Sequence, residues 1–247
     1  MTEYAKKAEL YHAYRWDYCQ EAIQYILAMM DTNDAPVVVD MGAGTGKLTQ
    51  HFVPHVHCIY AVEPDSNMLA ILADCLSSKV VIPLQRFAHD IPEIPDSTVD
   101  VILAAHAIHW FDFEKTRVEF NRIARPICRL VLVSNADMTQ GDFPSETRRL
   151  LNQYKNTTVI EKQDHDNMGN YFERETIAEA HFDADTSLTF EAYLGSMMST
   201  SYMPCPDDPM FPDLRDDAQA VFSKYADHGK IATKTRTTVM SGQLLRL

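Results

Sequence analysis

Three of the eight glycines in this 247-residue chain stand within five positions, at Gly42, Gly44 and Gly46. They directly follow the strand-like segment that begins with Val37–Val39, a continuous β-branched run typical of a strand buried on both faces. Glycine is scarce elsewhere, so the cluster marks a place where the backbone must turn tightly or approach a ligand closely. The segment therefore predicts a strand, a glycine loop and the start of a helix.

Strand and helix patterns alternate around this loop. Short apolar runs predict strands, and apolar residues at steps of three and four predict helices. We expect further strands over residues 56–62, 80–84, 99–104 and 129–133, and helices over residues 16–30, 66–76 and 113–124. This alternation indicates an α/β fold with a doubly wound, mostly parallel sheet and helices on both faces.

The alternation ends near Asn135. Helical spacing returns over residues 143–154, 190–199 and 213–226. The segment 203–212 contains four prolines and predicts a loop, and the segment 231–239 alternates with threonine and predicts a last strand. We see no linker between two independent domains and expect one domain.

The glycine spacing separates three kinds of nucleotide site. A nucleoside triphosphate loop needs G-x-x-x-x-G-K-[ST], but Met41 and Leu48 stand at its two ends. A dinucleotide loop needs G-x-G-x-x-G, but Lys47 stands at its third glycine. Glu63 ends the second expected strand, 21 residues after Gly42, where a carboxylate can accept hydrogen bonds from both ribose hydroxyls of a nucleoside.

The pattern Asp-x-Gly-x-Gly-x-Gly over residues 40–46 resembles the first motif of class I S-adenosylmethionine (SAM)-dependent methyltransferases. Residues 105–111, Ala-His-Ala-Ile-His-Trp-Phe, resemble a later segment of the small-molecule, trans-aconitate methyltransferase-like subgroup, and the likeness extends over most of the chain. The sequence departs from the family pattern at His89, where the family usually has an acidic residue, and at Ile127 and Cys128, which replace two turn glycines. The resemblance implies a Rossmann-like sheet with an antiparallel C-terminal strand and a helical cap.

The resemblance also implies how the single domain is organised. Its expected parts are an N-terminal helical cap over residues 1–35, a SAM-binding core over residues 36–135, an acceptor-side cap segment over residues 136–215, and a helix and strand that complete the core over residues 216–247.

The glycine loop would then face the methionine part of SAM, Glu63 would hold the ribose, and Met68 would flank the adenine. Arg15 would approach the SAM carboxylate through bidentate hydrogen bonds, although its aromatic segment could equally begin a helix packed on the core. The implied cofactor-binding set is Tyr14, Arg15, Asp40, Gly42, Ala43, Gly44, Gly46, Glu63, Pro64, Met68, Ala88, His89 and Ala105.

The candidate catalytic residues His106 and His109 follow the fourth expected strand, at the edge where open α/β sheets bind ligands. Either could take a proton from the acceptor or only position it, and a structural role for each stays open. The residues expected to bind the acceptor are Tyr11, Trp110, Tyr202 and Met203, of which the last two could instead be core residues.

The composition and charge of the chain limit the kinds of partner and the cellular compartment that we expect. The chain carries 22 basic and 35 acidic residues, a net charge of −13 that disfavours binding to nucleic-acid phosphates. No apolar stretch is long enough for a membrane span, the N-terminus lacks a signal-peptide core, and the five cysteines are scattered, so we expect a cytoplasmic protein with reduced thiols. The group His51, His55, His57 and Cys58 need not converge, and no metal site is expected.

The sequence thus predicts a metal-independent enzyme that transfers a methyl group from SAM to an O or N atom of a small molecule, as a monomer or homodimer. Two alternatives stay open. The first is a SAM-binding regulatory or partner protein without catalysis, because no single residue is obligatory for methyl transfer. The second is an NAD-linked oxidoreductase, which the glycine spacing disfavours.

Overall fold

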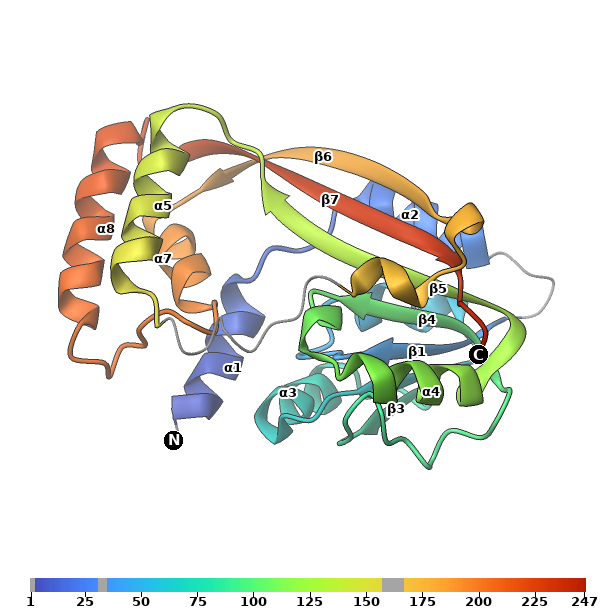
Figure 1. Ribbon diagram of the computed structural model, residues 1–247. Helices are drawn as coiled ribbons and strands as arrows, with labels where there is room; N and C mark the ends of the chain where they lie inside the picture. Colours follow the sequence, from blue (N-terminus) through green and yellow to red (C-terminus); the bar gives the residue numbers. More distant parts are fainter. Residues whose placement is uncertain (1–2, 31–34, 157–166) are drawn as a thin grey trace. The chain divides into compact units, whose positions relative to one another are not determined.

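The computed structural model describes residues 3–30, 35–156 and 167–247, which form two compact units. We call one of them the glycine-loop unit; its described residues are 17–30, 35–135, 167–182 and 237–247. We call the other the helical unit; its described residues are 3–16, 136–156 and 183–236. The expected organisation as one domain with caps stays a prediction. Figure 1 labels the elements of both units.

Seven strands of the described chain form one sheet in the order β3-β2-β1-β4-β5-β7-β6. They are β1 (Val37–Met41), β2 (Cys58–Val62), β3 (Val81–Leu84), β4 (Val99–Ala105), β5 (Ala124–Asp137), β6 (Ala178–Leu188) and β7 (Ile231–Gln243). β1 pairs in parallel with both β2 and β4, β2 with β3, and β4 with β5. The strand order therefore reverses beside β1, and the predicted doubly wound, mostly parallel sheet is confirmed.

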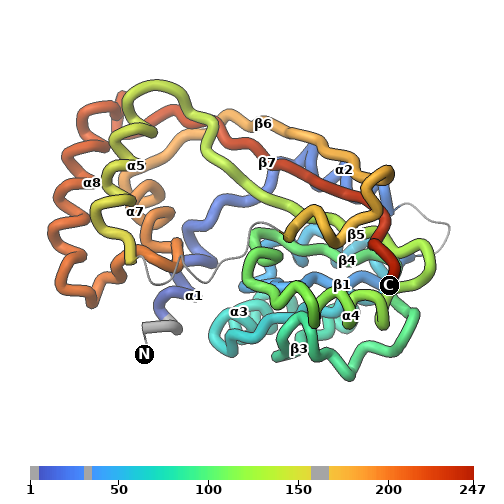
Figure 2. Tube along the Cα trace, viewed as in Figure 1, coloured from blue at the N-terminus to red at the C-terminus, as the bar shows by residue number. Residues whose placement is uncertain are grey.

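β7 is the antiparallel strand. The amide of Leu244 donates to the carbonyl of Cys128 near the start of β5, whereas the amide of Met138 donates to the carbonyl of Lys234 just past its end. Residue numbers in β7 thus fall as those in β5 rise, which confirms the expected antiparallel C-terminal strand. The three long strands β5, β7 and β6 lie side by side in Figures 1 and 2, and each contributes residues to both units.

β5 includes the residues that the family resemblance assigned to a turn. Ala124 pairs with Val99 and Arg129 with Val101, so the register shifts between these two pairs and β5 carries extra residues there. Pro126 falls in this stretch and has no amide hydrogen to give to the ladder. The side chain of Ile127 is 82% exposed. The departure from the family pattern is thus an irregularity within a strand instead of a turn.

The helices lie mainly where apolar spacing predicted them. The glycine-loop unit holds α2 (Gln20–Met30), α3 (Ser66–Cys75) and α4 (Phe113–Ile123), and the helical unit holds α1 (Glu3–Tyr14), α5 (Asp142–Tyr154), α7 (Phe190–Met198) and α8 (Phe211–Tyr225). Among the described residues, no helix is long and apolar enough to cross a membrane.

Three expectations about local structure were wrong. The helix expected from residue 16 begins at Gln20, and a separate helix, α1, precedes it within the expected N-terminal helical cap. β6 was also missed. The glycine loop leads into two short 3₁₀ helices, η1 (Thr49–His51) and η2 (Val53–His55), instead of an α-helix. Pro54 sits in the second of these and lacks the amide hydrogen that a longer helix would need there.

Each unit has its own apolar core. In the glycine-loop unit, Phe120 of α4 and Phe172 are fully or almost fully buried among residues of β1, β4 and β5. In the helical unit, the rings of Tyr193 and Phe222 lie 5.8 Å apart and join α7 to α8.

Within the helical unit, α1 and α7 approach each other at Gly195. A Cβ at this position would overlap the ring of Tyr14. Alanine in a helix interior normally stabilises a protein by about 0.5–1 kcal/mol relative to glycine. We predict that Gly195→Ala instead lowers the free energy of unfolding by about 1–3 kcal/mol, because the ring must move. Urea unfolding measures the change.

The control for this prediction is the double variant. In a Tyr14→Ala background the ring is absent, so Gly195→Ala should be neutral or stabilising. An equal loss of stability in both backgrounds would show that the contact with Tyr14 is not the cause.

Candidate functional site

The glycine loop follows β1 and has a backbone that only glycine adopts easily. Gly42, Gly44 and Gly46 have φ angles of 71°, 57° and 82°, all in the left-handed region. A Cβ on Gly42 would overlap the side chain of Ala107, which follows β4. A Cβ on Gly46 would lie 2.8 Å from the side chain of Leu76. The loop therefore needs glycine both for its backbone angles and for its close packing.

Glu63, at the end of β2, binds the loop directly. Its Oε2 accepts a hydrogen bond of 2.9 Å from the amide of Gly44, and its Oε1 accepts one of 2.9 Å from the amide of Asp65. Burial raises the pKa of Glu63, and these two amide donors oppose the rise. Each carboxylate oxygen has a second lone pair, so Glu63 can still accept hydrogen bonds from a ligand.

Asp40 lies on β1 beneath the loop and is fully buried. Its Oδ2 accepts a hydrogen bond of 2.7 Å from the hydroxyl of Thr49, but its Oδ1 has no hydrogen-bond partner among the described residues. The hydroxyl of Thr45, within the loop, is also buried and has no hydrogen-bond partner among the described residues. Burial raises the pKa of Asp40 to about 7, against the opposing effect of the Thr49 hydrogen bond.

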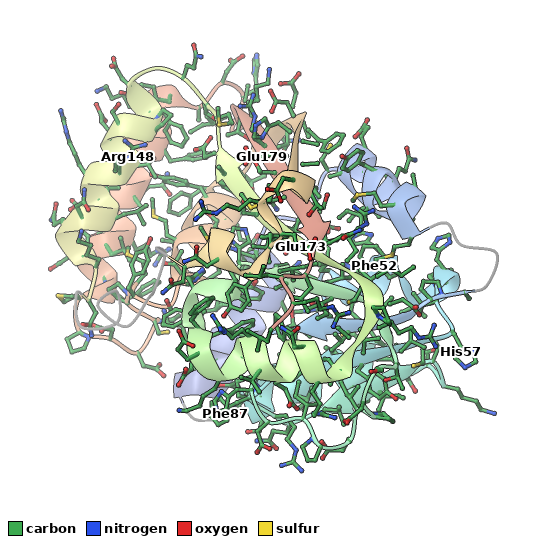
Figure 3. The ribbon with its side chains drawn as sticks, turned by 45° about the vertical axis from the view of Figure 1, so that its right-hand side comes forward. Phe52, His57, Phe87, Arg148, Glu173 and Glu179 are labelled. Carbon is green, nitrogen blue, oxygen red and sulfur yellow. The ribbon has the colours of Figure 1, made fainter. Side chains whose placement is uncertain are left out.

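The segment expected at the adenine lies after β2 and β3. Asp65 caps α3 by accepting hydrogen bonds from the amides of Asn67 and Met68, and Met68 is half-buried. His89 stacks on Phe87, with ring centroids 5.6 Å apart and planes 15° from parallel. Phe87 is 62% exposed and is labelled in Figure 3.

The other expected residues of this segment are small or exposed. Ala88 is buried and Pro64 is exposed. Phe87 was not among the predicted site residues, although it is an aromatic residue just after an expected strand and next to the candidate ligand contact His89.

His106 and His109 follow β4. His106 has a φ of 51°, its amide donates to the carbonyl of Val133 at 3.0 Å, and its Nε2 lies 2.7 Å from the amide nitrogen of Asn135. His109 lies in the short helix η3 (Ile108–Trp110), with its ring 5.4 Å from that of Trp110. Trp110 is 43% exposed.

The strand register brings these groups to one edge. Met41 of β1 pairs with Val62 of β2, and Asp40 pairs with Leu103 of β4. The glycine loop, Glu63 and the segment from Ala105 to His109 thus begin at neighbouring carboxyl ends of parallel strands, where the strand order reverses. In open α/β sheets this is the position at which ligands bind.

The remaining candidates, Tyr11, Tyr14, Arg15, Tyr202 and Met203, belong to the helical unit, and their roles stay predictions. The hydroxyl of Tyr14 donates to Glu191 at 2.8 Å, and this hydrogen bond raises the pKa of Tyr14.

Two further contacts of these residues lie within the helical unit. The guanidinium of Arg15 lies 5.8 Å from the ring centroid of Tyr11. Met203 is buried in the core of this unit.

The histidines of residues 51–57 do not form a metal site. His51 pairs instead with Asp17, with 2.9 Å between Nε2 and Oδ1. The described residues contain no group of three or more His, Cys, Asp or Glu side chains that could hold a metal ion.

Known proteins are similar to this chain in sequence. Residues 39–132 match the family model described as a methyltransferase domain. An uncharacterized methyltransferase of Mycobacterium tuberculosis is 39% identical over 125 residues, which are 51% of this chain and 49% of that protein. An uncharacterized methyltransferase-like protein of Schizosaccharomyces pombe is 28% identical over 153 residues, 59% of this chain and 56% of that one. The chain thus spans about half the length of the curated relatives it matches.

Solved structures share the fold. A candidate type II methyltransferase of Anaeromyxobacter dehalogenans superposes with a TM-score of 0.71 at 18% identity, covering 95% of this chain and all of that one. The YcgJ protein of Bacillus subtilis superposes with a TM-score of 0.53 at 15% identity, covering 91% of this chain and 99% of that one. The fold is therefore the Rossmann-like methyltransferase fold.

The sequence match includes the glycine loop, and it makes residues 39–132 similar to a methyltransferase domain. This similarity, with the methyltransferase fold, supports SAM as the cofactor. The residues present suit this ligand. SAM carries a cationic sulfonium, an ammonium group and two ribose hydroxyls, and the loop offers two acidic side chains, one with the buried, unpartnered Oδ1 of Asp40.

The raised pKa of Asp40 gives a prediction for the protein without ligand. Its ordinary value is 3.8 and its value in the fold is about 7. A carboxyl group with a raised pKa in the folded state contributes stability that is complete below its unfolded pKa and is lost as pH rises through the folded pKa. From pH 5 to pH 7 this group should therefore cost the wild-type protein about 2–3 kcal/mol.

Asp40→Asn removes the ionisation, so the variant should lack this slope and gain thermal stability over the wild type as pH rises from 5 to 8. Calorimetry of the ligand-free protein measures it. Asp185→Asn, at an exposed position of β6, is the matched control and should keep the wild-type slope. A slope that persists in Asp40→Asn would contradict the assignment.

Proposed function

We propose that this chain transfers a methyl group from SAM to an O or N atom of a small-molecule acceptor, without a metal ion. The observation that carries the proposal is the left-handed glycine loop bound by Glu63 beside Asp40, at the carboxyl edge where the strand order reverses. The loop spacing also disfavours the dinucleotide and triphosphate alternatives.

On the cofactor side, the loop backbone would bind the methionine part, and Glu63 would accept the ribose hydroxyls. Asp40 would give its unpartnered Oδ1 to a donor of the ligand, directly or through water. Met68 would flank the adenine, with the Phe87–His89 stack beside it. Tyr14 and Arg15 would close over the cofactor, as the family resemblance implies.

When bound, SAM supplies an electrophilic methyl group and leaves as S-adenosylhomocysteine. The protein has to place the acceptor atom in line with that methyl, and such positioning can supply about 7–11 kcal/mol of the barrier. A phenol or amine acceptor must also lose a proton, for which His109 is the candidate base. Trp110, with an exposed ring next to His109, would contact the acceptor, together with Tyr11, Tyr202 and Met203.

The cellular setting belongs to the proposal too. All five cysteines are free thiols, which suits a reducing compartment such as the cytoplasm. The net charge of −13 favours a small molecule over nucleic acid as the acceptor. We propose a monomer or homodimer.

The first test is ligand binding by titration calorimetry. We expect wild-type protein to bind SAM and S-adenosylhomocysteine and not NAD. Glu63→Ala removes a half-buried carboxylate that accepts hydrogen bonds, so SAM affinity should fall by about tenfold to 100-fold. Glu114→Ala is the matched control, because Glu114 is 75% exposed on α4. Binding of NAD without SAM would favour the oxidoreductase and overturn the proposal.

The second test is transfer of a radiolabelled methyl group from SAM to a panel of phenols, amines and carboxylic acids. With a phenol or amine acceptor, His109→Ala should lower kcat by about 10²–10⁴-fold while SAM affinity stays unchanged. The control is His57→Ala, at an exposed position outside the site (Figure 3). Tight SAM binding with no transfer to any acceptor would instead favour the regulatory protein.

A further inference from the structure

His106 holds an uncommon backbone conformation at the end of β4. Its φ of 51° lies in the left-handed region, which is unfavourable for a residue with a Cβ. Such a conformation persists where surrounding contacts fix it, and it is often found at functional sites. Two contacts fix it here, the 3.0 Å hydrogen bond from its amide to Val133 and the 2.7 Å contact of its ring with Asn135.

The second contact determines where the proton of the ring lies. A backbone amide can only donate, so Nε2 of His106 must accept the hydrogen bond from Asn135. A neutral imidazole with a lone pair on Nε2 carries its hydrogen on Nδ1. A second proton would place two N–H groups against each other at 2.7 Å, so protonation of this ring would break the contact.

Asn135 itself is held firmly. Its Nδ2 donates to the carbonyl of Asp17 at 3.0 Å, and its Oδ1 accepts from the hydroxyl of Thr237 at 2.7 Å. The oxygen of Thr237 accepts in turn from the amide of Cys19 at 2.9 Å. The carboxylate of Asp17 is paired with His51. The donor that faces His106 therefore has little freedom to turn away.

We propose that His106 is a neutral positioning residue for methyl transfer, with its tautomer fixed by the amide of Asn135, and that it does not accept the proton of the acceptor. The inference rests on the proposed function for its part in the reaction. The proposal gives the two histidines after β4 different roles. His109 then accepts the proton, or the acceptor is one that needs no base.

The first test needs no activity. Nitrogen-15 NMR of the imidazole rings, with the His106 signals assigned by their loss in His106→Gln, reports the tautomer. We expect a protonated Nδ1 and an unprotonated Nε2 in the neutral ring. A proton on Nε2 of the neutral ring would overturn the proposal.

The second test compares two substitutions of His106 in the methyl-transfer assay. Glutamine can place its side-chain oxygen near the former Nε2 and accept from Asn135, but it cannot serve as a base near neutral pH. Both glutamine and alanine carry a Cβ, so they share the backbone cost at φ 51°. We expect His106→Gln to be at least tenfold more active than His106→Ala and to keep the wild-type pH profile. Equal losses in both variants would show that acceptance from Asn135 is not the role of His106 and would overturn the proposal, and loss of the acid limb in His106→Gln would identify His106 as the base.

Circular dichroism and SAM affinity serve as controls for folding of both variants. If the wild-type protein transfers no methyl group at all, the proposed function fails, and the NMR result still decides the state of His106. If transfer occurs and the NMR shows a proton on Nε2 of the neutral ring, only this inference fails.

Discussion

The contact between Gly42 and Ala107 is the constraint on which the site depends. It allows the turn after β1 to lie directly against the turn after β4, and a Cβ on Gly42 would fill that space. The left-handed backbone at Gly44 then directs its amide to Glu63 at the end of β2. One close approach thus brings together the ends of three strands, and the ligand-facing groups follow from it.

The same packing explains the electrostatics of the site. Because the loop covers Asp40, water cannot solvate its carboxylate, and only Thr49 donates to it among the described residues. Glu63 is half-buried and receives two amide hydrogen bonds that oppose the rise of its pKa. A cationic ligand at this site would interact with the carboxylates of Asp40 and Glu63, which are fully or partly shielded from water, and charge interactions there are stronger than in bulk water.

Much of the glycine-loop unit could be predicted because its signals are local. The β-branched run before the loop, the glycine spacing and the carboxylate after β2 each lie within a few residues. β6 gave no local signal for a strand, because most of its side chains are exposed and its residues are mostly polar or small. α1 lies within the expected helical cap, but its bounds could not be predicted because its apolar residues do not form a clear stripe.

The hydrogen bonds of the site could not be predicted in the same way. Sequence spacing placed His106 near the site, but the amide that fixes its ring comes from β5, 29 positions later. The stack of Phe87 on His89 and the unpartnered oxygen of Asp40 likewise depend on side-chain geometry. A motif identifies which residues lie at the edge of the sheet, whereas their protonation and partners depend on distances between strands.

The placement of β7 determines whether the segment that matches the methyltransferase domain, residues 39–132, could be soluble on its own. The matched residues 39–132 end inside β5, whose next neighbour in the sheet is β7, from the C-terminal part of the chain. A fragment limited to the recognisable segment would leave the ladder groups of β5 unpaired along a long edge, and such edges pair with other chains and aggregate. The part of the chain that carries the family signature is therefore not a free-standing module, and its solubility depends on a strand that the signature does not include.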